Sequence, residues 1–473
     1  MDEIKFGTSG WRGIIAKDFT FANVRIVVRA IADHLLCRAD GNGEVVIGHD
    51  NRFMGEEFAR EAAGVLAAAG IKSCLCRSGV PTPVIAFEIL RRQLPGGINF
   101  TASHNPAPYQ GIKFSPEWGG PALPATTSDL EDRIKKLQKE SSVPFLPFEQ
   151  ALHKGWVREI DPSGPYRERL KQLVDIGAIA AAGLKVAFNP LFGVGQGFLD
   201  GLLRDAGVEV VTVNNRPDPL FGGHPPEPAP DTMADFIALV KGDPCLQLGL
   251  ATDGDADRYG VVDRDGTFIE PNYILPLLFD YLIRRRGVRK AAARTVATSH
   301  FLDAVGRHHG VQVHETAVGF KYIGELIRDE RILIGGEESA GLSIEGHIPE
   351  KDGILACLLV AEMVAVERKS LGELLADLYR RVGSFYTRRV NIRLNPELQR
   401  ALKEKLATPP SVLAGKKVAR HVTLDGSKFL FEDGTWILYR LSGTEPVVRT
   451  YVEAFSLDEL ERMATEAVGF ISG

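Results

Sequence analysis

Short apolar runs alternate with longer amphipathic segments along most of the chain. Apolar residues recur every three or four positions in segments such as Phe21 to Cys37, which predicts helices with one buried face. The runs Ile71 to Cys76 and Gly97 to Phe100 are short and apolar, which is typical of buried strands. Because strands and helices take turns in this way, we expect layered α/β structure.

The last part of the chain, from Arg388 to Gly473, shows a different order. Predicted strands are grouped there instead of alternating with helices. Strands fit 389–393, 422–424, 428–431, 436–439 and 447–453, and helices fit 396–406 and 457–471. This grouping favours an α+β domain.

The chain of 473 residues is too long for one core, so three to four domains are expected. The Pro-containing segment 143–162 reads as the irregular exit of the first domain, and a last linker is expected at 382–386. A charged helix is predicted at 128–140, with Ser128 and Glu131 spaced as a capping box, and a short strand at 295–298. The predicted domains are 1–150, 151–257, 258–381 and 382–473.

Composition and charge narrow the function classes. Apolar residues make up 44% and charged residues 25%, an ordinary balance for a globular protein. The net charge of −5 argues against a nucleic-acid partner, which needs a basic surface. No apolar run approaches the ~18 residues of a membrane span, and the N-terminus lacks a signal-peptide pattern. The five cysteines are scattered, so reduced thiols and a cytoplasmic location are expected.

The stretch TASHNP at 101–106 places Ser103 and His104 before an Asn-Pro turn. Such a turn can present backbone N–H groups to an anion. The Ser103 hydroxyl could therefore be a nucleophile or a phosphoryl carrier, although an ordinary turn has the same pattern.

An acidic loop follows the apolar run Leu246 to Ala251. Asp253, Asp255 and Asp257 stand at alternate positions with small residues between them, so their carboxylates can converge on one hard cation such as Mg²⁺ or Ca²⁺. An EF-hand is excluded, because its sixth position, normally Gly, is Arg258. A solvated acidic turn remains the alternative.

Two more polar loops follow predicted strands. The loop GGEESAG at 335–341 combines glycines, which allow close approach, with carboxylates that accept hydrogen bonds from sugar hydroxyls. The loop RLSGTEPVVRT at 440–450 combines arginines with hydroxyl side chains, as a phosphate clamp would. Each could instead be an ordinary turn with a cap.

Together these four stretches resemble the α-D-phosphohexomutase family, the phosphoglucomutases and phosphomannomutases. The resemblance covers essentially the whole chain. It also includes GTSGWRG at 7–13, GHDNR at 48–52, YQGIKF at 109–114, RPDPLFGGHPPEP at 216–228 and VGFKYIGE at 318–325.

The resemblance implies three similar α/β domains and a smaller C-terminal α+β domain around one central cleft. It implies reversible phosphoryl transfer between the 1- and 6-positions of a hexose phosphate, through a phosphorylated Ser103 and a hexose 1,6-bisphosphate intermediate. The implied cofactor is Mg²⁺, and glucose 1,6-bisphosphate is the implied activator. The partner would be a small hexose phosphate, with no nucleic acid or membrane, and the enzyme would be a monomer or homodimer.

The resemblance also assigns roles to single residues. The catalytic set is Ser103, Lys113, Arg12, His104 and Arg258, and the metal set is Ser103, Asp253, Asp255 and Asp257. The substrate contacts are Lys321, Glu337, Ser339, Arg440, Ser442, Gly443, Thr444 and Arg449. Proton transfer by Lys113 would need a lowered pKa. From the sequence, Lys113 could instead be a surface lysine and His104 a packing residue.

The residues of the predicted sugar loop indicate which sugar the enzyme prefers. The loop sequence GEES at 336–339 is similar to the one typical of phosphoglucomutases. In dual phosphomannomutases this loop tends to read GEMS, and in phosphoglucosamine mutases GEQS. Gly341 also stands where those enzymes often have a histidine. This favours conversion of glucose 1-phosphate to glucose 6-phosphate. The loop RLSGTEP is shared with mannose and glucosamine enzymes, so a phosphomannomutase or phosphoglucosamine mutase stays an alternative.

Two functions of another class remain open. A Mg²⁺-dependent sugar phosphatase could use the acidic loop, and it would release free phosphate. A non-catalytic sugar-phosphate-binding protein would need no nucleophile, so the presence of Ser103, the three aspartates and Lys113 argues against it.

Overall fold

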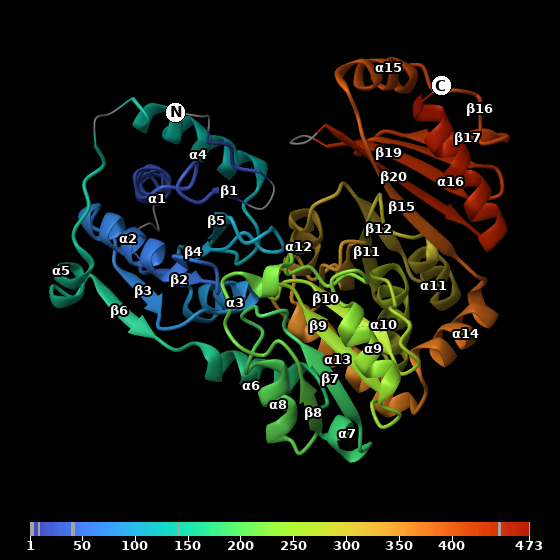
Figure 1. Ribbon diagram of the computed structural model, residues 1–473, viewed down its shortest axis with the longest axis horizontal. Coiled ribbons are helices and arrows are strands. Elements are labelled where there is room, and N and C mark those ends of the chain that lie inside the picture. Colours follow the sequence, from blue (N-terminus) through green and yellow to red (C-terminus); the bar gives the residue numbers. More distant parts are fainter. Residues whose placement is uncertain (1–3, 8–9, 39–42, 140–141, 443–445, 473) are drawn as a thin grey trace.

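The computed structural model describes residues 4–7, 10–38, 43–139, 142–442 and 446–472. Four sheets follow one another along the chain, and helices flank them. Figure 1 shows the C-terminal sheet (red) standing apart from the N-terminal sheet (blue), with the second and third sheets between and below them. The order of elements confirms the expected α/β class with a C-terminal α+β part. None of the helices in the described ranges has the length and apolar character that a membrane crossing requires.

The first sheet has the order β1–β5–β4–β2–β3–β6, and β5 runs antiparallel to both of its neighbours. Its strands are β1 (Trp11–Ile14), β2 (Val45–His49), β3 (Ser73–Cys76), β4 (Gly96–Phe100), β5 (Tyr109–Pro116) and β6 (Val157–Ile160). Its helices are α1 (Phe21–Leu36), α2 (Gly55–Ala68), α3 (Thr82–Arg92), α4 (Pro124–Leu137) and α5 (Phe148–His153). The apolar sides of α1, α2 and α4 bury one face of this sheet, and α3 covers the other.

The second sheet has the order β10–β9–β7–β8, and the third has the order β12–β11–β13–β14. The second is formed by β7 (Lys185–Asn189), β8 (Glu209–Thr212), β9 (Leu248–Thr252) and β10 (Tyr259–Asp263), with α6 (Ser163–Leu173), α7 (Ile176–Ala181), α8 (Leu199–Asp205), the short η1 (Phe221–Gly223) and α9 (Ala234–Gly242). The third is formed by β11 (Ala291–Thr295), β12 (Val313–Thr316), β13 (Ile332–Gly336) and β14 (Leu342–Ile344), with α10 (Pro271–Arg286), α11 (Phe301–His309), α12 (Phe320–Arg328), α13 (Gly353–Glu367) and α14 (Leu371–Val382).

Helix α13 joins the cores of these two sheets. It is apolar on all sides and buried from Gly353 to Ala365, as expected for a helix enclosed by protein. One continuous core contains α3, the second sheet, α13 and α10. The segments with the first three polar loops are therefore held together by shared packing.

The C-terminal sheet is antiparallel throughout, in the order β15–β20–β19–β18–β17–β16. Its strands are β15 (Tyr386–Arg393), β16 (Val412–Leu413), β17 (Lys416–Val422), β18 (Ser427–Phe431), β19 (Trp436–Leu441) and β20 (Val447–Ala454), with α15 (Pro396–Ala407) and α16 (Leu457–Ser472). Both helices contribute apolar residues to a core of their own on this sheet.

Three local expectations are wrong. Helix α4 begins at Pro124, because the fixed φ of a proline at the first helical positions already matches helical geometry. The Ser128–Glu131 capping box therefore lies inside the helix, and Glu131 Oε1 instead accepts a hydrogen bond from Phe6 N. The strand expected at 295–298 lies at 291–295, and Thr298 N closes a turn on Thr295 O.

The segment 143–162 is also not irregular. It contains α5 and β6, and β6 pairs with β3 at the edge of the first sheet. The first boundary expected at 150 thus falls inside α5, and the boundary expected at 257 falls inside the β9–β10 hairpin. We propose that the first two domains end after Ile160 and Asp263, where these sheets end.

Candidate active site

Three of the polar loops share one architecture. Each joins a strand with a parallel neighbour to a strand that runs antiparallel to it: β4 to β5, β9 to β10, and β13 to β14. Each loop also holds a non-glycine residue with positive φ, namely Ser103 (51°), Ala256 (57°) and Ala340 (69°). Such residues are uncommon and concentrate at functional sites. This repetition was not visible in the sequence.

Ser103 and the acidic loop are in direct contact. Ser103 Oγ donates a hydrogen bond to Asp253 Oδ2 at 2.8 Å, across 150 positions of sequence. Ser103 N donates to Thr101 Oγ1 at 2.8 Å, which fixes the turn. A Cβ atom on Gly254 would lie 2.8 Å from the Ser103 carbonyl oxygen, so this close approach of two loops requires a glycine.

The Ser103 loop is anchored by Arg52, which sequence reasoning did not assign a role. The buried Arg52 guanidinium donates to the carbonyl oxygens of Ser103, Asn105, Pro106 and Tyr109, at 2.5 to 3.0 Å. It also forms an ion pair with the buried Asp50 carboxylate, and Thr101 Oγ1 donates a hydrogen bond to the same carboxylate at 2.6 Å. The GHDNR motif contains Arg52, but only the fold shows that its donors all reach one loop.

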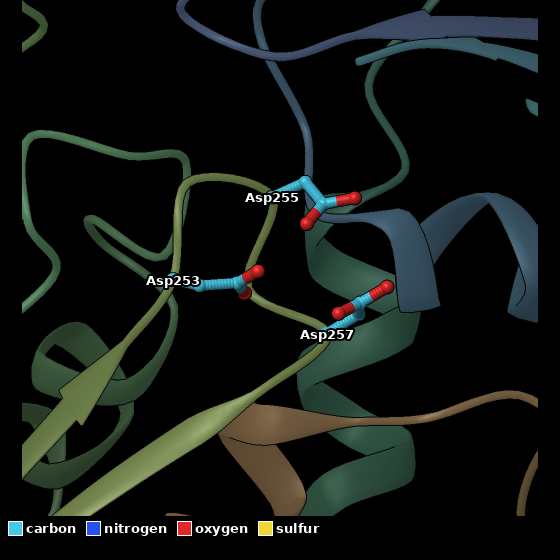
Figure 2. A group of neighbouring side chains, drawn as sticks. All are labelled: Asp253, Asp255 and Asp257. Carbon is cyan, nitrogen blue, oxygen red and sulfur yellow. The ribbon is translucent and has the colours of Figure 1, made fainter. Parts of the chain in front are cut away.

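The three aspartates converge as predicted. One ligand atom from each of Asp253, Asp255 and Asp257 lies within 4.8 Å of the others, and all three side chains are buried. Figure 2 shows the three side chains on one loop, all extending toward the same side of it, to the right of the view. The alternative of a solvated acidic turn is excluded by this burial.

These residues fit a divalent cation. Asp255 Oδ1 and Asp257 Oδ1 are buried and have no hydrogen-bond partner among the described residues. Burial and the two neighbouring carboxylates raise the pKa of Asp253 well above its usual range. Three buried carboxylates, two of which have an oxygen without a hydrogen-bond partner, form a donor set of the kind that Mg²⁺ prefers. We therefore treat Ser103, Asp253, Asp255 and Asp257 as the residues that would hold Mg²⁺.

Lys113 is not a surface lysine. Its side chain is buried, and its Nζ lies 2.6 Å from Asp255 Oδ2 and 2.8 Å from Asp257 Oδ2. Burial lowers the pKa of Lys113, but the two carboxylates outweigh that effect and the net shift is upward. The expectation of a lowered pKa is therefore wrong for this arrangement.

A second lysine, which the sequence did not single out, reaches the same loop. Lys351 Nζ lies 3.2 Å from Asp257 Oδ2 and 2.9 Å from Glu350 Oε1. The next two residues hold it there, because Asp352 caps α13 and Gly353 N donates to Ala256 O at 3.1 Å. In the sequence, Lys351 stands directly before a helix cap, which gives no reason to expect a site residue.

Arg12, His104 and Arg258 lie close to one another at the Ser103 loop. Arg12 donates to Asn105 Oδ1, and His104 Nδ1 lies 3.4 Å from Ser103 Oγ. The charge of Arg258, then burial and Arg12, strongly lower the pKa of His104, so its imidazole is neutral. Arg258 Nε is buried without a hydrogen-bond partner in the described ranges. The concentration of positive charge suits a phosphoryl group.

The predicted sugar loop lies beside these groups. Arg258 and Gly341 form a backbone bridge between the acidic loop and the GEES loop. Glu337 is buried, and its Oε1 accepts a hydrogen bond from Gly319 N at 3.0 Å. Burial and the adjacent Glu338 raise the pKa of Glu337 to about 7. Ser339 is partly buried in the same loop.

Lys321 lies at the first turn of α12. Its side chain is mostly buried, and burial lowers its pKa. Among the described residues no carboxylate oxygen lies within 4.0 Å of its Nζ, and the ring of Tyr322 lies 5.2 Å from it. A buried ammonium group without a carboxylate partner is suited to an anionic ligand.

The predicted phosphate loop connects β19 to β20. Arg440 and Arg449 are directly opposite each other in this hairpin, an arrangement that costs free energy unless an anion offsets it. Arg440 Nε donates to Asp425 Oδ1 at 3.0 Å, and Asp425 Oδ2 accepts from Val318 N at 3.0 Å. Ser442 N donates to Val447 O. Gly443 and Thr444 lie outside the described residues.

Comparisons with known proteins identify the family of this chain. Four family profiles match in chain order, described as phosphoglucomutase/phosphomannomutase alpha/beta/alpha domain I (3–141), domain II (164–266), domain III (270–382) and C-terminal domain (392–469).

Similar full-length proteins carry related names. A phosphoglucomutase/phosphomannomutase of Thermococcus kodakarensis is 32% identical, with 95% of this chain and 94% of that protein covered. A phosphoglucomutase of Komagataeibacter xylinus is 30% identical, with 99% and 91% covered. A crystal structure of a candidate phosphomannomutase from Thermus thermophilus is 35% identical, superposes with a TM-score of 0.87 and is covered completely, as is this chain.

The matches cover all four domains and nearly the full length of each relative. The chain therefore belongs to the phosphoglucomutase/phosphomannomutase family and is an enzyme of the phosphohexomutase type.

Proposed function

We propose that this enzyme interconverts glucose 1-phosphate and glucose 6-phosphate through a phosphorylated Ser103. The observation that carries the proposal is the contact between Ser103 Oγ and Asp253 inside a buried cluster of three carboxylates. A nucleophile held against a cation site, with arginines near the same loop, is what phosphoryl transfer requires.

The proposed reaction consists of two phosphoryl transfers, which side chains of this protein would assist. In the proposed reaction the free hydroxyl of the sugar phosphate attacks phosphorus on Ser103, a new O–P bond forms and the Ser103 O–P bond breaks. The resulting hexose 1,6-bisphosphate turns end for end and returns its other phosphoryl group to Ser103, so added glucose 1,6-bisphosphate should act as an activator. Arg12 and Arg258 would bind the transferring oxygens. When bound, Mg²⁺ would supply a Lewis acid that offsets negative charge.

Proton transfer is assigned to Lys113 in this proposal. Its Nζ is held protonated by Asp255 and Asp257. Lys113 must therefore leave these ion pairs and release its own proton to solvent before its neutral amine can accept the proton of the sugar hydroxyl. Lys351 also forms an ion pair with the Asp257 carboxylate, so its positive charge would still neutralise that carboxylate when Lys113 loses its own charge.

The substrate would span from the Ser103 loop to the C-terminal sheet. Glu337 and Ser339 would accept hydrogen bonds from the sugar hydroxyls, and Lys321 would contact the anionic substrate. Arg440, Ser442, Gly443 and Thr444, with Arg449, would hold the phosphate that does not react. Binding that phosphate remotely lets either end of the sugar reach Ser103.

The choice of glucose rests on the GEES loop. Relatives with both glucose and mannose names match this chain, so they do not decide between the sugars. Glu338 N is held by Thr298 Oγ1 at 3.2 Å, and Glu338 Oε2 is buried without a hydrogen-bond partner in the described ranges. A carboxylate there is suited to a hydroxyl donor of the sugar.

The test is an isomerisation assay with glucose, mannose and glucosamine 1-phosphates, Mg²⁺ and a trace of glucose 1,6-bisphosphate. We expect glucose 1-phosphate to be converted fastest and Ser103→Ala to lose at least about 10³-fold in kcat, because the phosphoryl carrier is gone. Ser73→Ala is the matched control, since Ser73 is equally buried in the first sheet and its hydroxyl has no described partner.

Other outcomes separate the alternatives. Free phosphate without isomer would indicate a Mg²⁺-dependent sugar phosphatase, and binding without turnover would indicate a sugar-phosphate-binding protein. Faster conversion of mannose or glucosamine 1-phosphate would keep the mechanism and overturn the choice of glucose. Full activity of Ser103→Ala would overturn the mechanism itself.

A further inference from the structure

A threonine of the first domain contacts one of the proposed metal-binding carboxylates of the second domain. Thr82 Oγ1 donates a hydrogen bond to Asp255 Oδ2 at 2.5 Å, and Thr82 N donates to the Asp255 carbonyl oxygen at 2.9 Å. Both residues are buried, and 173 positions separate them. One residue of α3 therefore holds both the backbone and the side chain of Asp255.

The direction of the Thr82 hydroxyl is set by a third residue. Asn99 Nδ2, on β4, donates to Thr82 Oγ1 at 2.9 Å. Because that bond uses Thr82 Oγ1 as an acceptor, the Thr82 proton is available for Asp255. Lys113 Nζ, 3.5 Å from Thr82 Oγ1, is also on the acceptor side.

The helix start explains why the backbone bond is available. Thr82 is the first residue of α3, and the first N–H groups of a helix have no partner within it. Thr82 N therefore donates its hydrogen bond to the Asp255 carbonyl oxygen. The positive end of the helix dipole lies beside the acidic loop. Pro81 and Pro83 on either side restrict the backbone of this position.

These contacts occupy one oxygen of Asp255 and leave the other free. Asp255 Oδ2 accepts from Thr82 and Lys113, whereas Asp255 Oδ1 has no partner among the described residues. A carboxylate held in this way cannot rotate without losing two hydrogen bonds. Asp257 shows a similar division, since its Oδ2 accepts from Lys113, whereas its Oδ1 has no hydrogen-bond partner among the described residues and only Arg258 Nε at 3.9 Å.

We propose that Thr82, oriented by Asn99, is a positioning residue that aims Asp255 Oδ1 at the divalent cation and thereby makes metal affinity depend on the docking of the first domain against the second. This inference rests on the proposed metal site. Hydrogen-bond partners of metal-ligating carboxylates typically change metal affinity by about 10- to 100-fold when they are removed.

The experiment measures Mn²⁺ affinity directly by electron paramagnetic resonance on the full-length enzyme without sugar. Mn²⁺ alone is the probe, because it uses the same oxygen donors as Mg²⁺. The variants are Thr82→Val, which keeps the shape and loses the hydroxyl, and Thr82→Ser, which restores it. Thr435→Val is the matched control, since Thr435 is a fully buried threonine that donates to Asp433 in the C-terminal domain.

We expect Thr82→Val to weaken Mn²⁺ binding by about 10-fold or more, Thr82→Ser to restore it to within about threefold, and Thr435→Val to leave it unchanged. Asn99→Leu, which removes the donor that orients Thr82, should give a smaller loss in the same direction. Thermal unfolding of each variant without metal shows that it is folded. If Thr82→Val does not fold, Asn99→Leu carries the test.

Two results would overturn the proposal in distinguishable ways. Wild-type affinity in a folded Thr82→Val variant would show that Thr82 does not position the ligand, while the proposed function would stand. A wild-type enzyme that isomerises hexose phosphates but binds no Mn²⁺ would refute the metal site and this inference together.

Discussion

Arg52 Nη2 donates a hydrogen bond to the carbonyl oxygen of Ser103 at 2.6 Å, and the same guanidinium binds three more carbonyl groups of that loop. The backbone of the proposed nucleophile is thus fixed from behind by a buried residue. A lysine has a single nitrogen and cannot reach four separated acceptors.

We therefore expect Arg52→Lys to lower kcat by about 10- to 100-fold, because a small displacement of the nucleophile has a large effect on rate. The assay is initial isomerisation rate at saturating substrate, with apparent Tm recorded alongside. Arg92→Lys is the control: Arg92 lies in the same domain and pairs with Glu44. An Arg52→Lys enzyme as fast as wild type would show that the loop needs no such anchor.

Magnesium should stabilise the folded protein as well as support catalysis. Three buried carboxylates repel one another, and a bound cation removes that repulsion. At about 100 times its Kd, a ligand adds about 2.7 kcal/mol to the free energy of unfolding. We expect apparent Tm to rise when MgCl₂ is added after EDTA treatment, and activity to return with it.

Asp253→Asn makes that prediction specific. Of the three aspartates, only Asp253 has a raised pKa, because burial and its two neighbours disfavour its charge, so that charge is costly without metal. In EDTA the Asn variant should be at least as stable as wild type, and its Mg²⁺-dependent gain in Tm should shrink. An equal gain in Tm for both proteins would mean that Mg²⁺ binds elsewhere.

Substrate affinity should depend on the protonation of Glu337. Burial raises the pKa of Glu337 from 4.5 to about 7. The stability that its neutral form contributes is fully present below about pH 4.5 and is lost as the pH rises through about 7. The charged form accepts hydrogen bonds from sugar hydroxyls, so KM should fall over about pH 6 to 8.

Glu337→Gln is the matched variant, because it keeps the shape and cannot ionise. Its KM should be higher at about pH 8, by roughly 10-fold, and should show only the pH dependence of the substrate phosphate itself. Parallel KM profiles for the two enzymes would remove Glu337 from the binding site.

Asp425 links the phosphate loop to the third domain. Its two oxygens accept from Arg440 Nε and from Val318 N, next to the Gly319 amide that holds Glu337. Asp425→Ala should raise KM for hexose phosphate by about 10-fold with a smaller change in kcat, since Arg440 loses its orientation. Asp433→Ala, in the turn between β18 and β19 of the same domain, should leave KM near the wild-type value. A kcat loss with unchanged KM in Asp425→Ala would contradict this.

Glu453 fastens the C-terminal sheet to the third domain. This buried carboxylate accepts from Trp436 Nε1 at 2.7 Å, from Ser299 Oγ and from His300 N. Glu453→Ala leaves these donors unpaired, at about 1–3 kcal/mol each, and should increase hydrogen exchange along β11 and β19. Burial raises the pKa of Glu453 to about 7, so Glu453→Gln should be much milder. Equal exchange in the Ala and Gln variants would argue against this role.

Most elements and all four polar loops could be predicted from the sequence, because they depend on local patterns. Helix α13 begins and ends where its apolar run predicts, and Asp253, Asp255 and Asp257 converge because alternate positions on a tight loop face one side. Expectations that depended on a single local rule were weaker. Ser128 and Glu131 have capping-box spacing, but Pro124 starts the helix earlier.

Tertiary structure alone decided which polar residues act together. Lys113 is paired with carboxylates 142 and 144 positions away, and those contacts raise its pKa, whereas the proton-transfer role implied by the family resemblance would need a lowered one. Arg52, Thr82 and Lys351 stand in segments whose local pattern predicts only a turn or a cap. Their importance comes from hydrogen bonds to loops of other strands and domains, and such contacts have no period or spacing that a sequence could reveal.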